Sequence, residues 1–332
     1  MKKKLLIIGT GGTIASITGD AGLTPGTDVT GLLSCVPQAA ELCDWEQIQL
    51  FSLDSTNVGP AQWVSLAKCI CRSYQAYDGF LILHGTDTMA YTAAALSYLI
   101  QNSGKPIVLT GSQKPMEDTD TDAKRNIEQS IRYAVSDHAS DVVIVFDGKV
   151  IPGGRARKVK SRSFDAFATV GFCDRAFIQN GTITEQYFPK EKIFRKTEFF
   201  VEMDPNVIDV KITPGLNPQM LLPLLEQYRG IVLEGFGLGG LPEYGHCDWF
   251  PVIQKLIQSG VTVAVTTQVP EEGSDMSIYE VGKKYIDNLD ILEGGTMTSE
   301  AMVVKLMWIL GQTKEPKKVR DLFYKKINYD RI

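Results

Sequence analysis

Long apolar runs and an excess of basic residues are both missing from this sequence of 332 residues. The longest apolar stretches, such as residues 5–8 and 80–83, are far shorter than the about 20 residues that a membrane-spanning helix needs. Lys and Arg number 34 against 39 Asp and Glu, so the formal net charge is −5. This acidic balance gives no electrostatic basis for attraction to nucleic acid or to an anionic membrane surface. The sequence therefore predicts no nucleic-acid partner and no membrane partner.

A secretion signal is also missing from the sequence. Residues 1–8 imitate one, with three lysines and then four apolar residues, but the glycines at 9, 11 and 12 end the apolar stretch. That stretch is shorter than the about 7–15 residues of a signal-peptide core. In a long chain without such a signal, cysteines whose spacing shows no disulfide framework are expected to be buried thiols in a reducing compartment. We therefore expect a cytoplasmic protein with six such thiols, Cys35, Cys43, Cys69, Cys71, Cys173 and Cys247.

Several common catalytic motifs are absent. The glycines near Thr13 suggest nucleotide binding, but the dinucleotide fingerprint needs Gly or Ala where Ile14 stands. No phosphate-binding loop, no Gly-x-Ser-x-Gly elbow and no His-Glu-x-x-His zinc motif occurs. Of the three histidines, His138 is expected at the surface and His246, beside Cys247, in a solvated loop. His84 stands near Thr86, and a role in the core is as plausible for it as a role in chemistry. What remains is threonine with acidic and amine partners, because a hydroxyl becomes a nucleophile when a neighbour removes its proton.

Short apolar runs alternate with amphipathic stretches along the chain. In the first half we expect strands at residues 5–8, 48–53, 79–83, 106–109 and 142–146, with helices at 60–74, 89–100 and 122–135. Strand and helix in alternation indicate right-handed crossovers and a parallel sheet. A second pattern of this kind has expected helices at residues 218–228, 249–258, 276–288 and 299–310, and strands at 230–234 and 261–266.

The sequence therefore predicts an α/β protein of two α/β domains. The larger N-terminal catalytic domain, residues 1–188, is expected to hold a mostly parallel, flavodoxin-like sheet. The prolines at 189, 205 and 214 mark a linker at residues 189–212. The smaller C-terminal domain, residues 213–332, is expected to hold a second parallel sheet.

Hydroxyl-bearing residues gather where the expected strands end, at residues 10–13, 54–57, 85–88 and 110–113. Ligands bind outside the carboxyl ends of parallel strands, so these loops predict a site. Ordinary loops of this type also need glycines and capping residues, which explains the glycines better than the repeated hydroxyls. A basic cluster could return to the same edge, although composition alone favours a solvated turn for it: Arg155, Arg157, Lys158, Lys160 and Arg162.

Two segments resemble the signatures of the asparaginase family. Residues 9–15 read Gly-Thr-Gly-Gly-Thr-Ile-Ala, and residues 83–91 read Leu-His-Gly-Thr-Asp-Thr-Met-Ala-Tyr. The resemblance is closest to the bacterial type I, cytoplasmic L-asparaginases, and it spans essentially the whole chain in the right order. Supporting matches lie at residues 54–57, 108–113, 154–158, 164–167, 275–280 and 305–308.

This resemblance implies an amidohydrolase, an L-asparaginase of asparagine catabolism that converts L-asparagine into L-aspartate and ammonia. Thr13 would be the nucleophile and would carry a covalent β-aspartyl intermediate. Thr86, Asp87 and Lys158 would form a second group that moves protons and activates water.

The resemblance also implies how the substrate is held. Ser55 and Asp87 would bind its α-carboxylate and α-amine, with Thr56 beside them, and the loop of Gly12 would offer backbone N–H groups. Each donor of such an oxyanion hole is worth about 10²–10³ in rate. No cofactor and no metal is implied, and the expected assembly is a homodimer or homotetramer.

The sequence departs from the family at two places. Leu23 stands where family members often carry a tyrosine on a mobile loop, so the activation of Thr13 is left open. The segment Thr267-Gln268-Val269 lacks the cysteine that some type I enzymes use in an allosteric asparagine site.

Three alternatives remain open at this point. One is mixed use of asparagine and glutamine, and another is the asparaginase-like subunit of a tRNA-dependent amidotransferase. That subunit normally carries an extra N-terminal domain, for which we expect no room before Gly9. The third is a non-catalytic amino-acid-binding protein on the same fold, which the fold alone does not exclude. The joint presence of Thr13, Thr86, Asp87 and Lys158 speaks against it.

Overall fold

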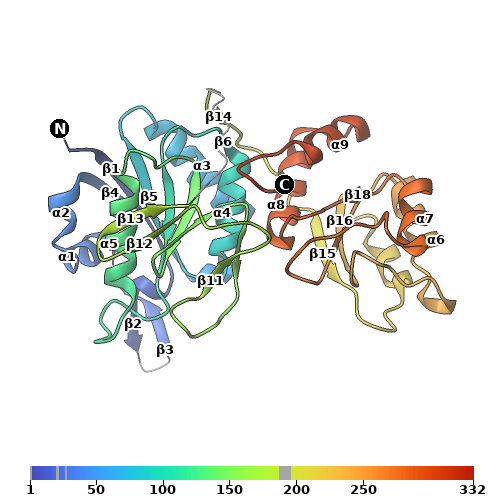
Figure 1. Cartoon of the computed structure of the whole chain (residues 1–332), viewed down its shortest axis with the longest axis horizontal. Coiled ribbons are helices and arrows are strands. Elements are labelled where there is room, and N and C mark those ends of the chain that lie inside the picture. The colour runs from blue at the N-terminus through green and yellow to red at the C-terminus, as the bar shows by residue number, and fades with distance from the viewer. Residues whose placement is uncertain (1, 20–21, 27, 187–195) are drawn as a thin grey trace. The chain divides into compact units, whose positions relative to one another are not determined.

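The structure is a computed structural model that describes residues 2–19, 22–26, 28–186 and 196–332, and only the backbone within residues 17–25. The chain divides into two compact units, Met1–Val201 and Glu202–Ile332 (Figure 1). This division lies inside the expected linker at residues 189–212. The end of that stretch is not a linker in conformation, because Val207–Lys211 forms strand β15.

The first unit is built around an eight-stranded sheet with the order β13-β12-β9-β8-β7-β5-β1-β4 (Figure 1). Five of its strands run parallel, namely β1 (Lys4–Gly11), β4 (Asp44–Leu53), β5 (Gly79–Leu83), β7 (Ile107–Thr110) and β8 (Val142–Phe146). In chain order these strands are arranged 2-1-3-4-5, which is the flavodoxin-like order. The predicted mostly parallel sheet is thereby confirmed. Three antiparallel strands extend it, β9 (Lys149–Pro152), β12 (Ala176–Gln179) and β13 (Thr182–Glu185).

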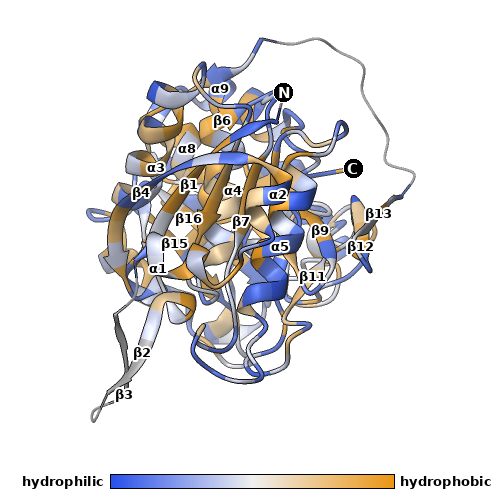
Figure 2. Ribbon diagram, turned by 90° about the vertical axis from the view of Figure 1, so that its left-hand side faces the viewer, coloured by the Kyte–Doolittle hydropathy of each residue, from blue (hydrophilic) through white to orange (hydrophobic). Residues whose placement is uncertain are grey.

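Helices cover the sheet because the inner parallel strands, β1, β5, β7 and β8, are buried on both faces. Alternate residues such as Leu5 and Leu81 share one core cluster with apolar residues of α1 (Val29–Ser34), α2 (Ala39–Leu42) and α5 (Ala123–Ala134). The intervening strand residues point to the opposite face, where α4 (Met89–Leu99) contacts β7 and β8, and α3 (Pro60–Ser73) packs on α4. Figure 2 shows β1 and β7 as hydrophobic and α5 with a hydrophilic outer side.

Several short elements of the first unit were not expected from the sequence. They include two 3-10 helices, η1 (Thr13–Ala15) and η2 (Ser55–Asn57). Three antiparallel pairs complete the unit, β2 (Ser16–Gly19) with β3 (Gly22–Pro25), β6 (Ile100–Gln101) with β14 (Glu198–Phe199), and β10 (Ala156–Lys158) with β11 (Phe167–Thr169).

The second unit holds a four-stranded parallel sheet in the order β15-β16-β17-β18, as predicted. Its strands are β15, β16 (Gly230–Gly235), β17 (Thr262–Thr267) and β18 (Leu292–Glu293). The α-helices are α6 (Phe250–Gln258), α7 (Glu280–Asn288), α8 (Ser299–Gln312) and α9 (Pro316–Tyr324), and the 3-10 helices are η3 (Pro218–Leu224) and η4 (Gly245–Cys247). None of the helices in the described ranges has the length and apolar character needed to cross a bilayer.

Two helix predictions in the second unit need correction. The helix expected at residues 218–228 is the 3-10 helix η3, which contains Pro223, and a proline removes a donor and obstructs the preceding α-helical turn. The helix expected at residues 276–288 begins only at Glu280. The Met276 N–H is already bonded to Glu293 Oε1 at 2.6 Å, so the backbone at that point is held by β18.

The expectation of buried cysteines is wrong for most of them. Cys43 is buried, and burial raises the pKa of its thiol to about 11. Cys35 and Cys71 are exposed, and the remaining three are partly exposed. The pattern failed because cysteine is small enough to occupy a helix surface or a loop without disturbing the core.

Candidate active site

Glycines bring three of the predicted loops into direct contact at the carboxyl edge of the first sheet. A Cβ atom built on Gly12 would lie 2.2 Å from Gly85 Cα, and one built on Gly85 would lie 2.6 Å from Ser55 Oγ. Gly12 also has φ 84°, a conformation that glycine adopts without steric cost. Thr13 and Thr86 each follow one of the two touching glycines. The backbone therefore brings the predicted nucleophile and the second predicted threonine into one neighbourhood.

Lys158 joins the predicted second group from strand β10. Its Nζ donates to Thr86 Oγ1 at 2.8 Å and to Asp87 Oδ1 at 2.6 Å. The Lys158 side chain is 17% exposed, whereas that of Asp87 is 56% exposed. The ladder between β10 and β11 places Lys158 opposite Phe167, which directs the lysine inward. The solvated-turn interpretation of this residue is therefore wrong, and the carboxylate of Asp87 stays accessible to a ligand.

Ser55 and Thr56 lie in different surroundings although they are adjacent. Ser55 is buried, and its Oγ accepts from the Asp87 N–H at 3.3 Å, which leaves the hydroxyl hydrogen uncommitted by that bond. Thr56 is exposed, and both its N–H and its hydroxyl donate to Asp54 Oδ1, at 2.8 and 2.7 Å. These bonds lower the pKa of Asp54. The geometry thus ties Ser55 to Asp87 and occupies Thr56 locally.

Thr13 begins helix η1 and is half-buried. Its hydroxyl has no hydrogen bond to any other residue that the structure describes. The backbone of Leu23 lies in strand β3, but its side chain falls outside the described residues, as do the contacts it would make.

Gln113 is a member of the site that sequence reasoning did not assign. Its Oε1 accepts from the Thr86 hydroxyl at 3.3 Å, and its Nε2 donates to Ser163 O at 3.1 Å. The signal available in the sequence was its position at the end of the strand next to Thr86. A glutamine at a strand end is too common to single out, so the contact itself was needed.

His84 supports the same loop from the core. The imidazole is fully buried, with Nδ1 2.7 Å from Gly85 O and Nε2 3.0 Å from Thr92 Oγ1. The Trp63 Nε1–H donates to that same threonine oxygen at 3.0 Å. The threonine hydroxyl therefore donates to Nε2, and the hydrogen of His84 is on Nδ1 and donates to the Gly85 carbonyl. His84 is a neutral anchor of the residue that precedes Thr86.

Burial lowers the pKa of His84 to about 4 from its ordinary 6.5. Below pH 6.5 the His84 imidazole binds a proton in the unfolded chain but stays neutral in the folded chain. The free energy of unfolding therefore falls as the pH falls toward 4. We expect this group to cost about 2 kcal/mol at pH 5 relative to pH 8. Denaturant unfolding of the protein and of His84→Gln at both pH values measures it. The variant should show a shallower loss, and equal losses in both proteins would contradict this account.

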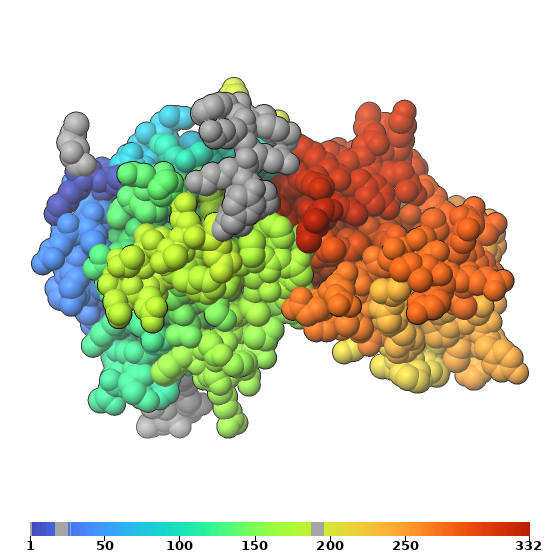
Figure 3. All heavy atoms as spheres, in the orientation of Figure 1, coloured from blue at the N-terminus to red at the C-terminus, as the bar shows by residue number. Residues whose placement is uncertain are grey.

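A cavity of the first unit lies away from the predicted site. It has a volume of about 410 Å³, lies beside hairpin β12–β13, seen in yellow-green on the surface in Figure 3, and contains none of the predicted site residues. Its lining includes Arg125 and Gln129 of helix α5. Within the described ranges no group of three or more His, Cys, Asp or Glu side chains is arranged to hold a metal ion.

Comparisons with known proteins identify the class of protein to which this fold and these loops belong. Residues 4–190 match the asparaginase N-terminal family and residues 206–323 the glutaminase/asparaginase C-terminal domain. The chain therefore belongs to the asparaginase/glutaminase family. It is 34% identical to an L-asparaginase of Thermococcus kodakarensis over 98% of each chain, and the solved structure of the thermostable L-asparaginase from that organism superimposes with a TM-score of 0.90.

Other relatives include a second L-asparaginase and a subunit of an amidotransferase. A structure of L-asparaginase I from Vibrio cholerae is 26% identical, covers 100% of both chains and gives a TM-score of 0.89. A subunit of the glutamyl-tRNA(Gln) amidotransferase of Pyrococcus abyssi is 33% identical over 96% of this chain and 74% of its own length. Family membership and the homologous L-asparaginases support an amidohydrolase activity on asparagine.

Proposed function

We propose that this protein hydrolyses L-asparagine to L-aspartate and ammonia with Thr13 as the nucleophile. The observation that supports this most is the ammonium group of Lys158, which contacts both Thr86 Oγ1 and Asp87 Oδ1 next to the glycine contact that carries Thr13. A hydroxyl, a lysine and a carboxylate in one hydrogen-bonded group provide the means to move protons that a two-step acyl transfer needs.

The first step joins Thr13 Oγ1 to the side-chain amide carbon of asparagine. The hydroxyl proton leaves Thr13, the carbon–nitrogen bond breaks, and the nitrogen departs as ammonia with that proton. Negative charge develops on the amide oxygen during the attack. The Thr86 N–H has no partner among the described residues, so it is one donor that this charge can use.

The second step hydrolyses the β-aspartyl ester. Water adds to the ester carbon, the bond to Thr13 Oγ1 breaks, and a water proton returns to that oxygen. We assign the orientation of this water to Thr86 and Lys158. Lysine orients a neighbouring hydroxyl through its ammonium group.

Substrate recognition follows from charge. An amino acid carries one cation and one anion, and the exposed carboxylate of Asp87 suits the α-amine. The Ser55 hydroxyl suits the α-carboxylate. Of the other predicted contacts, the Gly12 N–H donates to Leu53 O at 3.0 Å and Thr56 donates to Asp54, so they line the site rather than donate to the substrate. Lys158 partly neutralises Asp87, which keeps a carboxylate at this position from repelling the substrate.

Ammonia release by the purified full chain tests the proposal. We expect ammonia from L-asparagine and slower release from L-glutamine, measured at the same concentration. Comparable rates for the two would favour the mixed amidohydrolase, and binding without ammonia release would favour an amino-acid-binding protein. Release that depends on an added tRNA-binding partner protein would favour the amidotransferase function, which the Pyrococcus abyssi relative makes the leading alternative.

Two further parts of the proposal concern location and assembly. We propose a cytoplasmic location, which is supported by a 26% identical structure from Campylobacter jejuni, that of a probable cytoplasmic L-asparaginase. We also propose a homodimer or homotetramer. Light scattering of the active protein measures the assembly, and a fully active monomer would contradict it.

A further inference from the structure

Gln113 links Thr86 to the loop that follows Lys158. Its Oε1 accepts from Thr86 Oγ1, while its Nε2 donates to Ser163 O at 3.1 Å and approaches Lys160 O at 3.5 Å. Those two carbonyls belong to the loop that follows Lys158 in strand β10. Because carbonyl oxygens only accept, they fix which end of the amide is the NH₂ group. The oxygen of Gln113 must then face Thr86.

This orientation determines how the Thr86 hydroxyl is used. The hydroxyl hydrogen points to Gln113 Oε1, and a lone pair of Thr86 Oγ1 is left for the ammonium of Lys158. Displacing Gln113 would release the hydroxyl to rotate and would free the loop after Lys158. Misplacement by about 1 Å in such an arrangement can cost about 10²-fold in rate.

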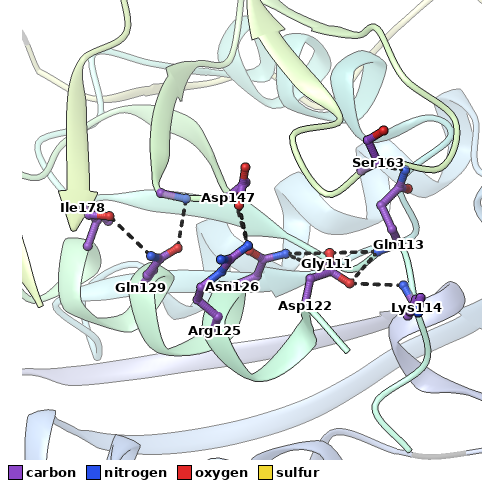
Figure 4. A network of polar contacts seen from close by, with 11 residues as sticks. Gly111, Gln113, Lys114, Asp122, Arg125, Asn126, Gln129, Asp147, Ser163 and Ile178 are labelled. Atoms are coloured by element: carbon purple, nitrogen blue, oxygen red, sulfur yellow. Dashed lines mark hydrogen bonds and ion pairs between the residues drawn. The ribbon is translucent and has the colours of Figure 1, made fainter. Parts of the chain in front are cut away.

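Two buried side chains at the start of helix α5 hold the segment that carries Gln113 (Figure 4). The N–H groups of Gln113 and Lys114 both donate to the carboxylate of Asp122 at 3.0–3.1 Å. Asp122 stands at the N-cap position of the helix, but its side chain makes no capping bond there. Asn126, one turn further along, donates through Nδ2 to Asp122 Oδ2 at 3.1 Å and to Gly111 O at 3.0 Å. Asp122 is 2% exposed and Asn126 is fully buried.

We propose that Asp122, together with Asn126, is a positioning residue that acts through Gln113 on Thr86 and Lys158. This inference rests on the proposed function and assigns a role to residues that touch neither the reacting hydroxyls nor Lys158. A carboxylate this deeply buried is costly unless its oxygens are bonded. Here the carboxylate accepts hydrogen bonds from the backbone N–H groups of residues 113 and 114. Moving Gln113 would therefore leave a buried carboxylate without its donors, and this cost holds Gln113 in place.

The same helix offers a matched control. Gln129, a little further along α5, accepts from the Gly148 N–H at 3.0 Å and lies 3.4 Å from Ile178 O. Gln129 therefore holds a turn of the same sheet through hydrogen bonds to the backbone, as Asp122 does, but it does not contact residues 111–114 (Figure 4). Gln129→Met should lower stability and leave turnover unchanged.

Steady-state kinetics of asparagine hydrolysis test the inference. Asp122→Asn keeps the shape of the side chain but places an NH₂ group against either the loop N–H groups or Asn126. We expect kcat to fall about 10²-fold with KM changed less than about threefold. Gln113→Met should show the same loss, and the double variant should lose little more than either single one. Multiplied losses, or a kcat for Asp122→Asn equal to that of Gln129→Met, would overturn the inference.

Hydrogen exchange without substrate separates this inference from the proposed function. Asp122→Asn should speed exchange of the Val159 and Lys160 amides, which donate to Ala166 O at 2.8 and 3.3 Å, and Gln129→Met should not. If the wild-type protein releases no ammonia, the proposed function fails and this measurement alone decides the positioning role. Unchanged exchange at residues 159 and 160 in Asp122→Asn would overturn it.

Discussion

Lys158→Met is expected to lower kcat/KM for asparagine by about 10²–10⁴-fold, the range that one positioned proton-transfer group contributes. Methionine keeps most of the length and apolar character of the lysine stem but removes the donor to Thr86 Oγ1 and Asp87 Oδ1. The loss should appear mainly in kcat, because the Lys158 side chain takes part in the proton transfers of the chemical steps. Steady-state ammonia release measures it.

Lys160→Met is the matched control. Lys160 lies two residues further along the same segment, pairs with Asp165 and is 46% exposed. An ion pair at that exposure is worth little, so kcat/KM should change less than about twofold. Equal losses for the two lysines would show that the basic segment acts through its overall charge rather than through Lys158.

Thr13→Ala and Thr86→Ala are each expected to reduce turnover to a small residue, by about 10³-fold or more. Removing the nucleophile prevents the covalent step, and removing Thr86 separates Lys158 from the water and ester. Groups that act as a unit lose most of the rate on the first deletion. The double variant should therefore be only slightly slower than the slower single variant.

Thr110→Val is the control for losing a threonine hydroxyl beside the site. Thr110 Oγ1 donates to Val145 O at 2.7 Å in the core of the sheet. Its replacement should lower the free energy of unfolding by about 1–3 kcal/mol while turnover stays close to that of the wild type. Losses that multiply in the Thr13/Thr86 double variant would contradict a shared mechanism.

The hydroxyls at the strand ends show how far the sequence could lead. Their position was predicted, because parallel strands end at one edge. Their roles were not separable, because a hydroxyl serves structure and chemistry equally well. Thr10 Oγ1 donates to Leu83 O at 2.9 Å and Thr110 Oγ1 to Val145 O, so these two join neighbouring strands. Ser55 and Thr86 contact other side-chain or loop groups at the site instead.

Contacts between residues far apart in the sequence were harder to predict than the strands and helices. The parallel sheet and its order follow from local apolar periodicity, which any stretch of sequence displays by itself. Lys158 and Thr86, which are in contact, lie 72 residues apart in the sequence. Their contact depends on the β10–β11 pair, which no local pattern in the sequence predicted. Gln113 and Asp122 were missed for the same reason, since their meaning lies in what they touch.

The contact between Gly12 and Gly85 bears on how this protein can be engineered. The spacing between the loops of Thr13 and Thr86 is set by backbone against backbone, with 2.2 Å to Gly85 Cα for any added Cβ at Gly12. No library of side chains at these positions can tune that spacing, because even alanine would force the two loops apart. Variation aimed at substrate preference has its freedom elsewhere, at solvent-facing positions such as Thr56. The two glycines are best held constant in any directed-evolution design.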